Sequence, residues 1–271
     1  MKPTALVTLD RDHPGFRDPD YRARRDEIAA LALSWQPGHP VPEVRYTDVE
    51  NEVWSTALRE LRPLHQRYAC DAFARGWARL AFDEHRVPSF RRVNEHLAQT
   101  SGFTLVPVAG LASPAEFMLE LAEGRFLATQ YVRHASRPLY TPEPDVLHEI
   151  IGHAALLADP AFAELNRLFG KATRRAGGAE IEALIRVYWY TLEFGVVGRG
   201  DDYEVIGAGL LSSFGELGRF RESVPKRAFD LDEIARTPFD PTDYQRVLFV
   251  ASDVEAMKTS LSAWLEAMAR R

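Results

Sequence analysis

Apolar residues recur at spacings of three and four between Thr47 and Ala81, and this pattern constrains the fold of the chain more than any other. They are Val53, Trp54, Leu58, Leu61, Leu64, Tyr68, Phe73 and Trp77. Such spacings place side chains on one side of an α-helix, so the stretch predicts one or two long helices with a single buried stripe. Pro63 is expected to break or kink them, because proline interrupts the hydrogen bonding of a helix interior.

The residues outside this stretch predict more helices and only short strands. No internal repeat or change of composition marks a linker, so the sequence predicts a mostly α-helical fold with a few short β-strands. One domain is expected to cover residues 1–271. Helices are expected before Trp35, between Pro88 and Gly102, and at 160–176, 179–195, 229–235 and 252–269, with short strands within 103–110 and 126–135.

Two helix starts have capping residues. Ser113, with Glu116 three residues later, forms the pattern of a capping box. Thr141 directly before Pro142 is typical of an N-cap, because proline is tolerated in the first turn. We expect one helix to run from there through residues 148–153.

The composition limits the kinds of partner. A net charge of -6 and a pI near 5.8 provide no basic field for nucleic acid. The single cysteine, Cys70, excludes an internal disulfide and any multi-cysteine metal site, and suits a reducing compartment. No apolar run reaches the roughly 18 residues of a membrane span, and the opening MKPTALVTLD lacks the apolar stretch of a signal peptide. We therefore expect a cytoplasmic protein that binds neither nucleic acid nor membrane.

Residues 148–153 read His-Glu-Ile-Ile-Gly-His, so two histidines stand five positions apart. On an ideal α-helix this spacing corresponds to a rotation of about 140°, so His148 and His153 would share a metal only if the helix distorts. The zinc protease pattern H-E-x-x-H is one residue shorter, and Gly152 could relax the backbone here. Glu193, in the apolar stretch VYWYTLEFG, is the best candidate for a third ligand, because a buried carboxylate needs a partner.

Three readings of these residues remain open at this point. Two histidines and a carboxylate form the facial triad of non-heme Fe(II) oxygenases, which leaves positions on the iron open. The same ligands hold catalytic zinc in other enzymes, so ligand identity alone does not choose the metal. The structural alternative is that both histidines are core residues bonded to the backbone, with Glu193 paired to Arg186 or Arg133.

Five longer stretches place the chain in a family context. They read DHPGFRDPDYRARRDEIA, QPGHPVPEVRY, TQYVRHASRPLYTPEPDVLHEIIGH, YWYTLEFG and GAGLLSSFGEL, and they extend from about residue 10 to the C-terminus. With these stretches in this order, the chain resembles the catalytic domain of the pterin-dependent aromatic amino acid hydroxylases. The resemblance implies that fold, and it implies that His148, His153 and Glu193 bind Fe(II). It also implies tetrahydrobiopterin or a related reduced pterin as cofactor, and O2 as co-substrate.

The resemblance assigns further residues to the amino acid substrate. It implies that Arg133 clamps the substrate carboxylate, and a guanidinium fork does suit a planar carboxylate. The structural alternative is an ion pair between Arg133 and Asp145. The family context favours the substrate role over this ion pair. Other positions matched to the amino acid site are Thr141, Trp189, Phe194, Ser212 and Glu216. Each of these alone would be read as a core aromatic residue, a turn or cap residue, or a surface acid.

A second group of residues is matched to the pterin. The family uses backbone groups at the positions of Gly110, Leu111 and Ala112, a stacking ring at Phe117 and an acid at Glu149. The chain departs from the family near this site. Pro114 replaces a hydroxyl residue that would contact the pterin, and Leu127 and Ile206 stand where polar or ring side chains are common, so both are expected to alter the pocket.

The resemblance favours hydroxylation of L-phenylalanine to L-tyrosine. Hydroxylation of phenylalanine at the 3-position, or of tryptophan at the 5-position, keeps the same mechanism and is the nearest rival. A zinc hydrolase with Glu149 as general base is a distant alternative from another class. The chain shows no counterpart of the N-terminal regulatory domain or the C-terminal tetramerisation tail of the animal enzymes, so we expect a monomer.

Overall fold

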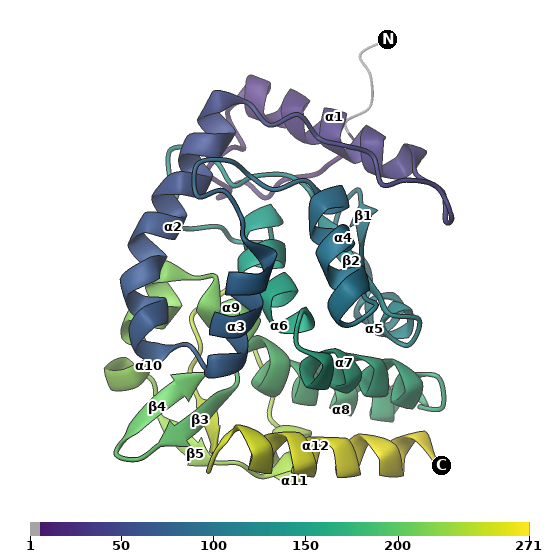
Figure 1. Ribbon diagram of the computed structural model, residues 1–271, viewed down its shortest axis with the longest axis vertical. Helices are drawn as coiled ribbons and strands as arrows, with labels where there is room; N and C mark the ends of the chain where they lie inside the picture. Colours follow the sequence, from purple (N-terminus) through teal and green to yellow (C-terminus); the bar gives the residue numbers. More distant parts are fainter. Residues whose placement is uncertain (1–5, 271) are drawn as a thin grey trace.

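Helices account for most of the structure, a computed structural model that describes residues 6–270 (Figure 1). The expectation about the opening decapeptide rests partly on residues 1–5, which lie outside this range. The helices of the first half are α1 (Pro19–Ser34), α2 (Asp48–Tyr68), α3 (Asp71–Leu80), α4 (Phe90–Thr100) and α5 (Pro114–Leu121). Those of the second half are α6 (Ala155–Leu157), α7 (Pro160–Thr173), α8 (Gly178–Tyr188), α9 (Ala208–Leu211), α10 (Phe214–Ser223), α11 (Leu231–Ile234) and α12 (Val254–Ala269). Two π-helices, η1 (His148–Ala154) and η2 (Trp189–Glu193), interrupt the α-helical pattern.

The long apolar stripe forms the two helices α2 and α3. Thr47 caps α2 in a capping box with Glu50. The predicted break at Pro63 is wrong, because α2 continues through it. Pro63 lies on the exposed side of α2, where water can hydrate the carbonyl group that loses its partner. The chain breaks instead at Cys70, whose N–H donates to the carbonyl of Val205.

The strands form two small sheets. Strands β1 (Thr104–Val108) and β2 (Arg125–Thr129) pair in parallel and are connected by α5, whose capping box at Ser113 is confirmed. The second sheet has the order β4-β3-β6-β5, with only β3 and β4 antiparallel. Its strands, which the sequence analysis missed, are β3 (Val196–Arg199), β4 (Asp202–Val205), β5 (Lys226–Ala228) and β6 (Leu248–Ala251). They are too short to show the alternation that identifies a strand.

The helix expected from Thr141 is wrong at its start. Residues 142–143 form a bend, and helical structure begins only at Val146. The hydroxyl of Thr141 donates to the carbonyl of Glu143, so it stabilises a turn and caps no helix. This leaves residues 130–145 as a long connection between β2 and η1, whereas a strand had been expected to continue to residue 135.

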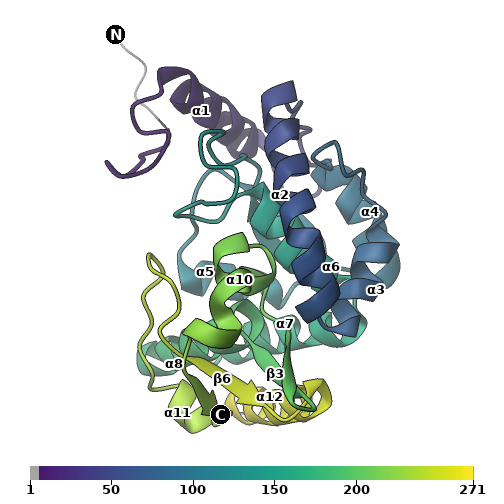
Figure 2. The same cartoon turned by 90° about the vertical axis from the view of Figure 1, so that its left-hand side faces the viewer.

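Contacts with α1 fasten this connection to the rest of the molecule. The buried guanidinium of Arg25 bonds Glu143 at 2.8 Å and lies 3.2 Å from the ring centre of Tyr131. The hydroxyl of Tyr21 donates to the carbonyl of Val132. Figure 2 shows α1 above this connection, at the end of the molecule away from the second sheet. The N-terminal helix therefore holds a segment that would otherwise have little regular hydrogen bonding.

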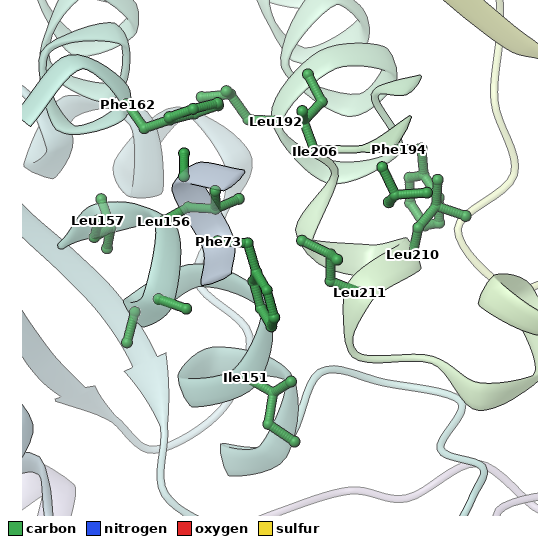
Figure 3. Packing of buried hydrophobic residues seen from close by; sticks show 14 of the residues in the cluster. Phe73, Ile151, Leu156, Leu157, Phe162, Leu192, Phe194, Ile206, Leu210 and Leu211 are labelled. Carbon is green, nitrogen blue, oxygen red and sulfur yellow. The ribbon is translucent and has the colours of Figure 1, made fainter. Parts of the chain in front are cut away.

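The main hydrophobic core of the described chain includes residues from Val53 to Met268, and Ile28, Val44 and Tyr131 form a second, smaller cluster. Figure 3 shows the centre of the main core, where Phe73 of α3, Ile151 of η1, Leu156 of α6 and Leu211 of α9 lie around one interior. The helices and short strands given above confirm the predicted fold, which is mostly α-helical with a few short β-strands. None of the helices in residues 6–270 has both the length and the apolar character that a bilayer crossing requires.

Two helix glycines give a matched test of packing at α3. A Cβ on Gly76 would lie 1.8 Å from the carbonyl oxygen of Ala155, whereas a Cβ on Gly218 of α10 would meet nothing within 4 Å. We expect Gly76→Ala to lower the free energy of unfolding by about 1–3 kcal/mol through overpacking. Gly218→Ala should raise it by up to about 1 kcal/mol, because alanine is the better helix former. Urea unfolding checks both, and equal effects would contradict the packing described here.

Candidate active site

A cavity of about 610 Å³ opens between the β1–β2 unit, η1, η2 and the segment before β6. Every residue that the sequence analysis assigned to metal, substrate or pterin lines it. These residues are Gly110, Leu111, Ala112, Phe117, Arg133, Thr141, His148, Glu149, His153, Trp189, Glu193, Phe194, Ser212 and Glu216. Their roles are proposals, but their convergence on one cavity is a fact of the fold.

The two histidines meet because η1 is a π-helix. Each hydrogen bond of a π-helix spans five residues, so side chains five apart come to the same side. The Nε2 atoms of His148 and His153 lie 3.0 Å apart. Gly152 lets η1 pack closely against α9, since a Cβ on Gly152 would lie 2.7 Å from the carbonyl oxygen of Ala208. The distortion on which a shared metal depends is therefore present.

Glu193 reaches the histidines from the second π-helix. Its Oε1 lies 3.0 Å from Nε2 of His153, and its Oε2 lies 3.7 Å from Nε2 of His148. The bond from the N–H of Phe194 to the carbonyl of Trp189 spans five residues and closes η2. Gly207 lets this turn pack closely, because a Cβ there would lie 2.4 Å from the carbonyl oxygen of Glu193. The alternative pairing of Glu193 with Arg186 or Arg133 is not found in the described chain.

Ser212 determines which nitrogen of His148 carries the proton. Its hydroxyl donates to the carbonyl of Ala208 at 2.8 Å, so it can only accept from Nδ1–H of His148, at 2.9 Å. That tautomer leaves a lone pair on Nε2, directed at His153 and Glu193. A second shell of this kind is typical of metal-binding histidines.

The protonation of the three residues also favours a bound cation. Burial and the neighbouring His153 lower the pKa of His148 to about 4, so its imidazole stays neutral. Burial opposes charge on His153 and Glu193, but their mutual attraction outweighs it and raises the pKa of His153 while lowering that of Glu193. Two imidazole nitrogens and a carboxylate within 3.7 Å share too few protons to satisfy their lone pairs. This donor set suits Fe(II) or Zn²⁺.

A second carboxylate, Glu149, also lies close enough to the histidines to be a ligand. Ligand atoms of His148, Glu149 and His153 lie within 4.8 Å of one another. However, Oε1 of Glu149 accepts hydrogen bonds from the N–H and the hydroxyl of Thr129. Burial raises the pKa of Glu149 to about 7, which weakens it as an anionic ligand. Glu193, which contacts both Nε2 atoms, is the better third ligand.

Arg133 forms the ion pair with Asp145 that the sequence analysis had placed second. Nε donates to Oδ2 at 2.9 Å and Nη2 to Oδ1 at 2.7 Å, with both side chains buried. The backbone N–H groups of Arg133 and His148 also donate to Asp145. Within residues 6–270 Nη1 of Arg133 has no hydrogen bond, and Arg133 lines the cavity. The ion pair and a role in substrate binding are therefore compatible.

Aromatic rings form the wall nearest to α5. Phe117 packs edge-on against Phe126 and Tyr188, and Phe126 lies 4.5 Å from His153 between ring centres. Leu111 is 67% exposed at the mouth of the cavity. The hydroxyl of Ser113 is taken up by the capping box of α5, so it does not face the cavity.

The three departures from the family pattern lie in different environments. Pro114 and Leu127 line the cavity. Ile206 is fully buried in the core and does not line the cavity, so its expected effect on the pocket stays a prediction that could act only through the residues packed on it. Its side chain packs against the backbone at Gly195, behind η2 (Figure 3).

The segment between α11 and β6 contributes a wall for which the sequence analysis assigned no site residue. Phe239 stacks on Trp189, and Oε1 of Gln245 accepts from the indole N–H of Trp189 at 2.9 Å. Glu216, expected to be a surface acid on its own, is 5% exposed and accepts from the N–H of Gln245. Burial raises the pKa of Glu216, whose Oε2 has no hydrogen-bond partner in residues 6–270. No local pattern in PFDPTDYQ signals these contacts, because the segment has no regular periodicity.

The chain is similar to known proteins in sequence and in fold. Residues 4–271 match the family model of the biopterin-dependent aromatic amino acid hydroxylases, and the chain belongs to that family. It is 41% identical over 255 residues to phenylalanine-4-hydroxylase of Bos taurus, covering 92% of this chain and 56% of the relative. It is 39% identical over 267 residues to tyrosine 3-monooxygenase of Drosophila melanogaster, covering 97% of this chain and 46% of the relative. The chain thus spans about half the length of these relatives.

A solved structure shares the fold. Phenylalanine hydroxylase from Chromobacterium violaceum, with bound iron(III) and 7,8-dihydrobiopterin, superposes with a TM-score of 0.75 at 33% identity. The match covers 83% of this chain and 84% of that one. The family resemblance and the fold class inferred from the sequence are confirmed.

The two candidate carboxylates can be distinguished by metal binding. We expect Glu193→Gln to weaken Fe(II) binding by at least about 100-fold, beyond the roughly 10- to 100-fold cost of losing an outer-shell partner. Glu149→Gln should still bind Fe(II) in equimolar amount, because its oxygen is already engaged by Thr129. Anaerobic calorimetric titration measures both. The reverse order of effects would make Glu149 the ligand.

Proposed function

We propose that this chain is a non-heme Fe(II), tetrahydropterin-dependent monooxygenase that hydroxylates L-phenylalanine to L-tyrosine. The observation that carries the proposal is the approach of His148, His153 and Glu193 to within 3.7 Å at a cavity with aromatic walls and a buried arginine. The names of the relatives support a ring hydroxylase, and they include both phenylalanine and tyrosine enzymes. The aromatic walls support an apolar ring as substrate.

His148, His153 and Glu193 would hold the iron, and Ser212 would keep His148 in the tautomer that binds metal. When bound, iron would activate O2 and the reduced pterin would supply two electrons, so that one oxygen atom enters the aromatic ring and the other goes to the pterin. The protein would hold these partners in one cavity, whose aromatic and apolar walls limit the access of water to the reacting atoms.

The amino acid would be held at both of its ends. Nη1 of Arg133 is available to the substrate carboxylate, while Asp145 fixes the rest of the guanidinium. The unpartnered oxygen of Glu216 and the hydroxyl of Thr141 add polar groups to the same cavity. Trp189 and Phe194, whose ring centres lie 4.6 Å apart, would receive the aromatic ring. A bound ring would thus lie close to the metal site on η1 and η2.

The pterin would lie against the wall formed by residues 110–112 and Phe117. Gly110, Leu111 and Ala112 line the cavity and would offer backbone groups to the pterin, and Phe117 offers a ring for stacking. Glu149, which hydrogen bonds Thr129 at the end of β2, lies between this wall and the histidines. With Pro114 in place of a hydroxyl residue, one side-chain contact to the pterin would be missing.

We further propose a single catalytic domain that acts as a monomer in the cytoplasm, with no nucleic acid or membrane partner. The main core that joins residues from Val53 to Met268 supports the single domain. The net charge of -6 supports the absence of a nucleic acid partner. Sedimentation of the purified protein would test the monomer.

Reconstitution tests the proposed reaction. The protein is loaded anaerobically with Fe(II) and given O2, tetrahydrobiopterin and, separately, phenylalanine, tyrosine or tryptophan. We expect para-tyrosine, formed only when both iron and pterin are present. Meta-tyrosine or hydroxytryptophan would retain the mechanism and change the substrate assignment. Turnover of an ester or amide with zinc and without O2 would overturn the proposal.

A substitution of Arg133 tests the carboxylate site. Arg133→Lys keeps a positive charge beside Asp145 but removes the planar fork, so the buried carboxylate is not left uncompensated. We expect the affinity for phenylalanine to fall by about 1.5–3 kcal/mol, the range for a hydrogen bond to a charged group, with iron binding unchanged.

The matched control is Arg91→Lys on the exposed face of α4, which should leave that affinity as in the wild type. Calorimetry with the iron-loaded protein measures it. Unaltered phenylalanine binding by Arg133→Lys would rule out this residue as the carboxylate site.

A further inference from the structure

The side chain of Trp189 is held by two ring contacts and one hydrogen bond. It opens η2, four residues before Glu193. Its ring stacks on Phe239 with centres 4.2 Å apart and planes at 12°, and it lies 4.6 Å from the ring of Phe194. The indole N–H donates to Oε1 of Gln245 at 2.9 Å. The rings fix the plane of the indole, and the hydrogen bond fixes its edge.

The hydrogen bond is needed because stacking alone does not determine which edge of the indole faces the cavity. The χ2 torsion of tryptophan is broad and roughly two-fold, so the indole can turn over while a neighbouring ring still covers its face. The two orientations present different outlines to the cavity. Only one of them directs the N–H at Gln245, so this acceptor selects the orientation.

Gln245 is itself held in place through its backbone. The backbone N–H of Gln245 donates to Oε1 of Glu216 at 2.8 Å, and Gln245 is 7% exposed. It lies between α11 and β6, in a segment without helix or strand. One residue thus connects the aromatic wall at Trp189 with the polar wall at Glu216.

We infer that Gln245 is a positioning residue that acts through Trp189 and thereby determines where the substrate ring lies relative to the metal-binding residues. The inference rests on the proposed function and extends it to the choice of ring carbon. Gln245 lines the cavity, but its Oε1 is engaged by the indole N–H and it makes no hydrogen bond to His148 or His153, so we assign its effect on the reaction to the indole. A displacement of about 1 Å at a reacting ring is enough to change rate and outcome.

The test is a double-mutant cycle in the iron-loaded protein. Gln245→Met keeps the length of the side chain and removes the acceptor, and Trp189→Phe keeps an aromatic ring and removes the donor. The double variant completes the cycle, and Gln99→Met on the exposed side of α4 is the control. The measurements are kcat and KM for phenylalanine, the distribution of hydroxyl positions, and the pterin oxidised per amino acid hydroxylated.

We expect Gln245→Met to lower kcat/KM about three- to tenfold, the equivalent of one hydrogen bond. It should also broaden the distribution of hydroxyl positions, and it should increase the pterin oxidised per product. The double variant should behave like Trp189→Phe, since both substitutions remove the same interaction. Iron binding should not change. A purely structural role would lower stability without altering the positions hydroxylated.

A readout independent of turnover is the indole N–H itself. The chain has five tryptophans, and the signal of Trp189 in a spectrum of 15N-labelled protein is identified by its loss in Trp189→Phe. In Gln245→Met that signal should shift, and its proton should exchange faster with water.

Additive effects in the cycle, an unaltered product distribution in Gln245→Met, or an unaltered indole signal would each overturn the inference while the proposed function stands. Failure of the wild type to hydroxylate any aromatic amino acid would remove the proposed function, and the inference with it.

Discussion

The buried ion pair between Arg133 and Asp145 is the interaction on which the site depends. Asp145 accepts four hydrogen bonds, three from Arg133 and one from the N–H of His148. It therefore joins the connection after β2 to the first turn of η1. An isolated buried carboxylate would be costly, and these donors make it tolerable. The same contacts fix the guanidinium at the cavity and the start of the π-helix, so the proposed substrate and metal sites are positioned by one residue that lines neither.

Much of the fold could be predicted from the sequence because its cues are local. The stripe in α2 and α3, the capping box at Ser113 and the family stretches each lie within a short segment. The errors have equally definite causes. Pro63 is accommodated because it faces solvent, and the turn at Thr141 resembles a helix start in sequence but is held by contacts with α1. Asp145 and Gln245 act through partners distant in sequence or irregular in structure, and neither has a pattern of its own.

The walls of the cavity come from parts of the chain that differ in how regularly they are hydrogen bonded. The two π-helices and α9 are packed so closely that glycines are required at Gly152 and Gly207. The segment before β6 has no ladder of backbone bonds, and its position depends on side chains such as Gln245 and Phe239. The residues proposed to bind metal are thus fixed by close backbone packing. Residues that shape the substrate pocket are fixed by fewer and more replaceable contacts, which suits a family whose members are named for different aromatic amino acids.

The π-helical turn at η1 has a consequence for how such a site can arise. An α-helix with a histidine pair four apart already presents both rings to one side. With one more residue between the histidines, both rings lie on the same side only if the helix widens locally. The helix does so from His148 to Ala154. Insertion or deletion of a single residue there would therefore change the register of the whole ligand set, while most substitutions would not. The histidine pair of this chain differs from the H-E-x-x-H zinc pattern by one residue within one turn.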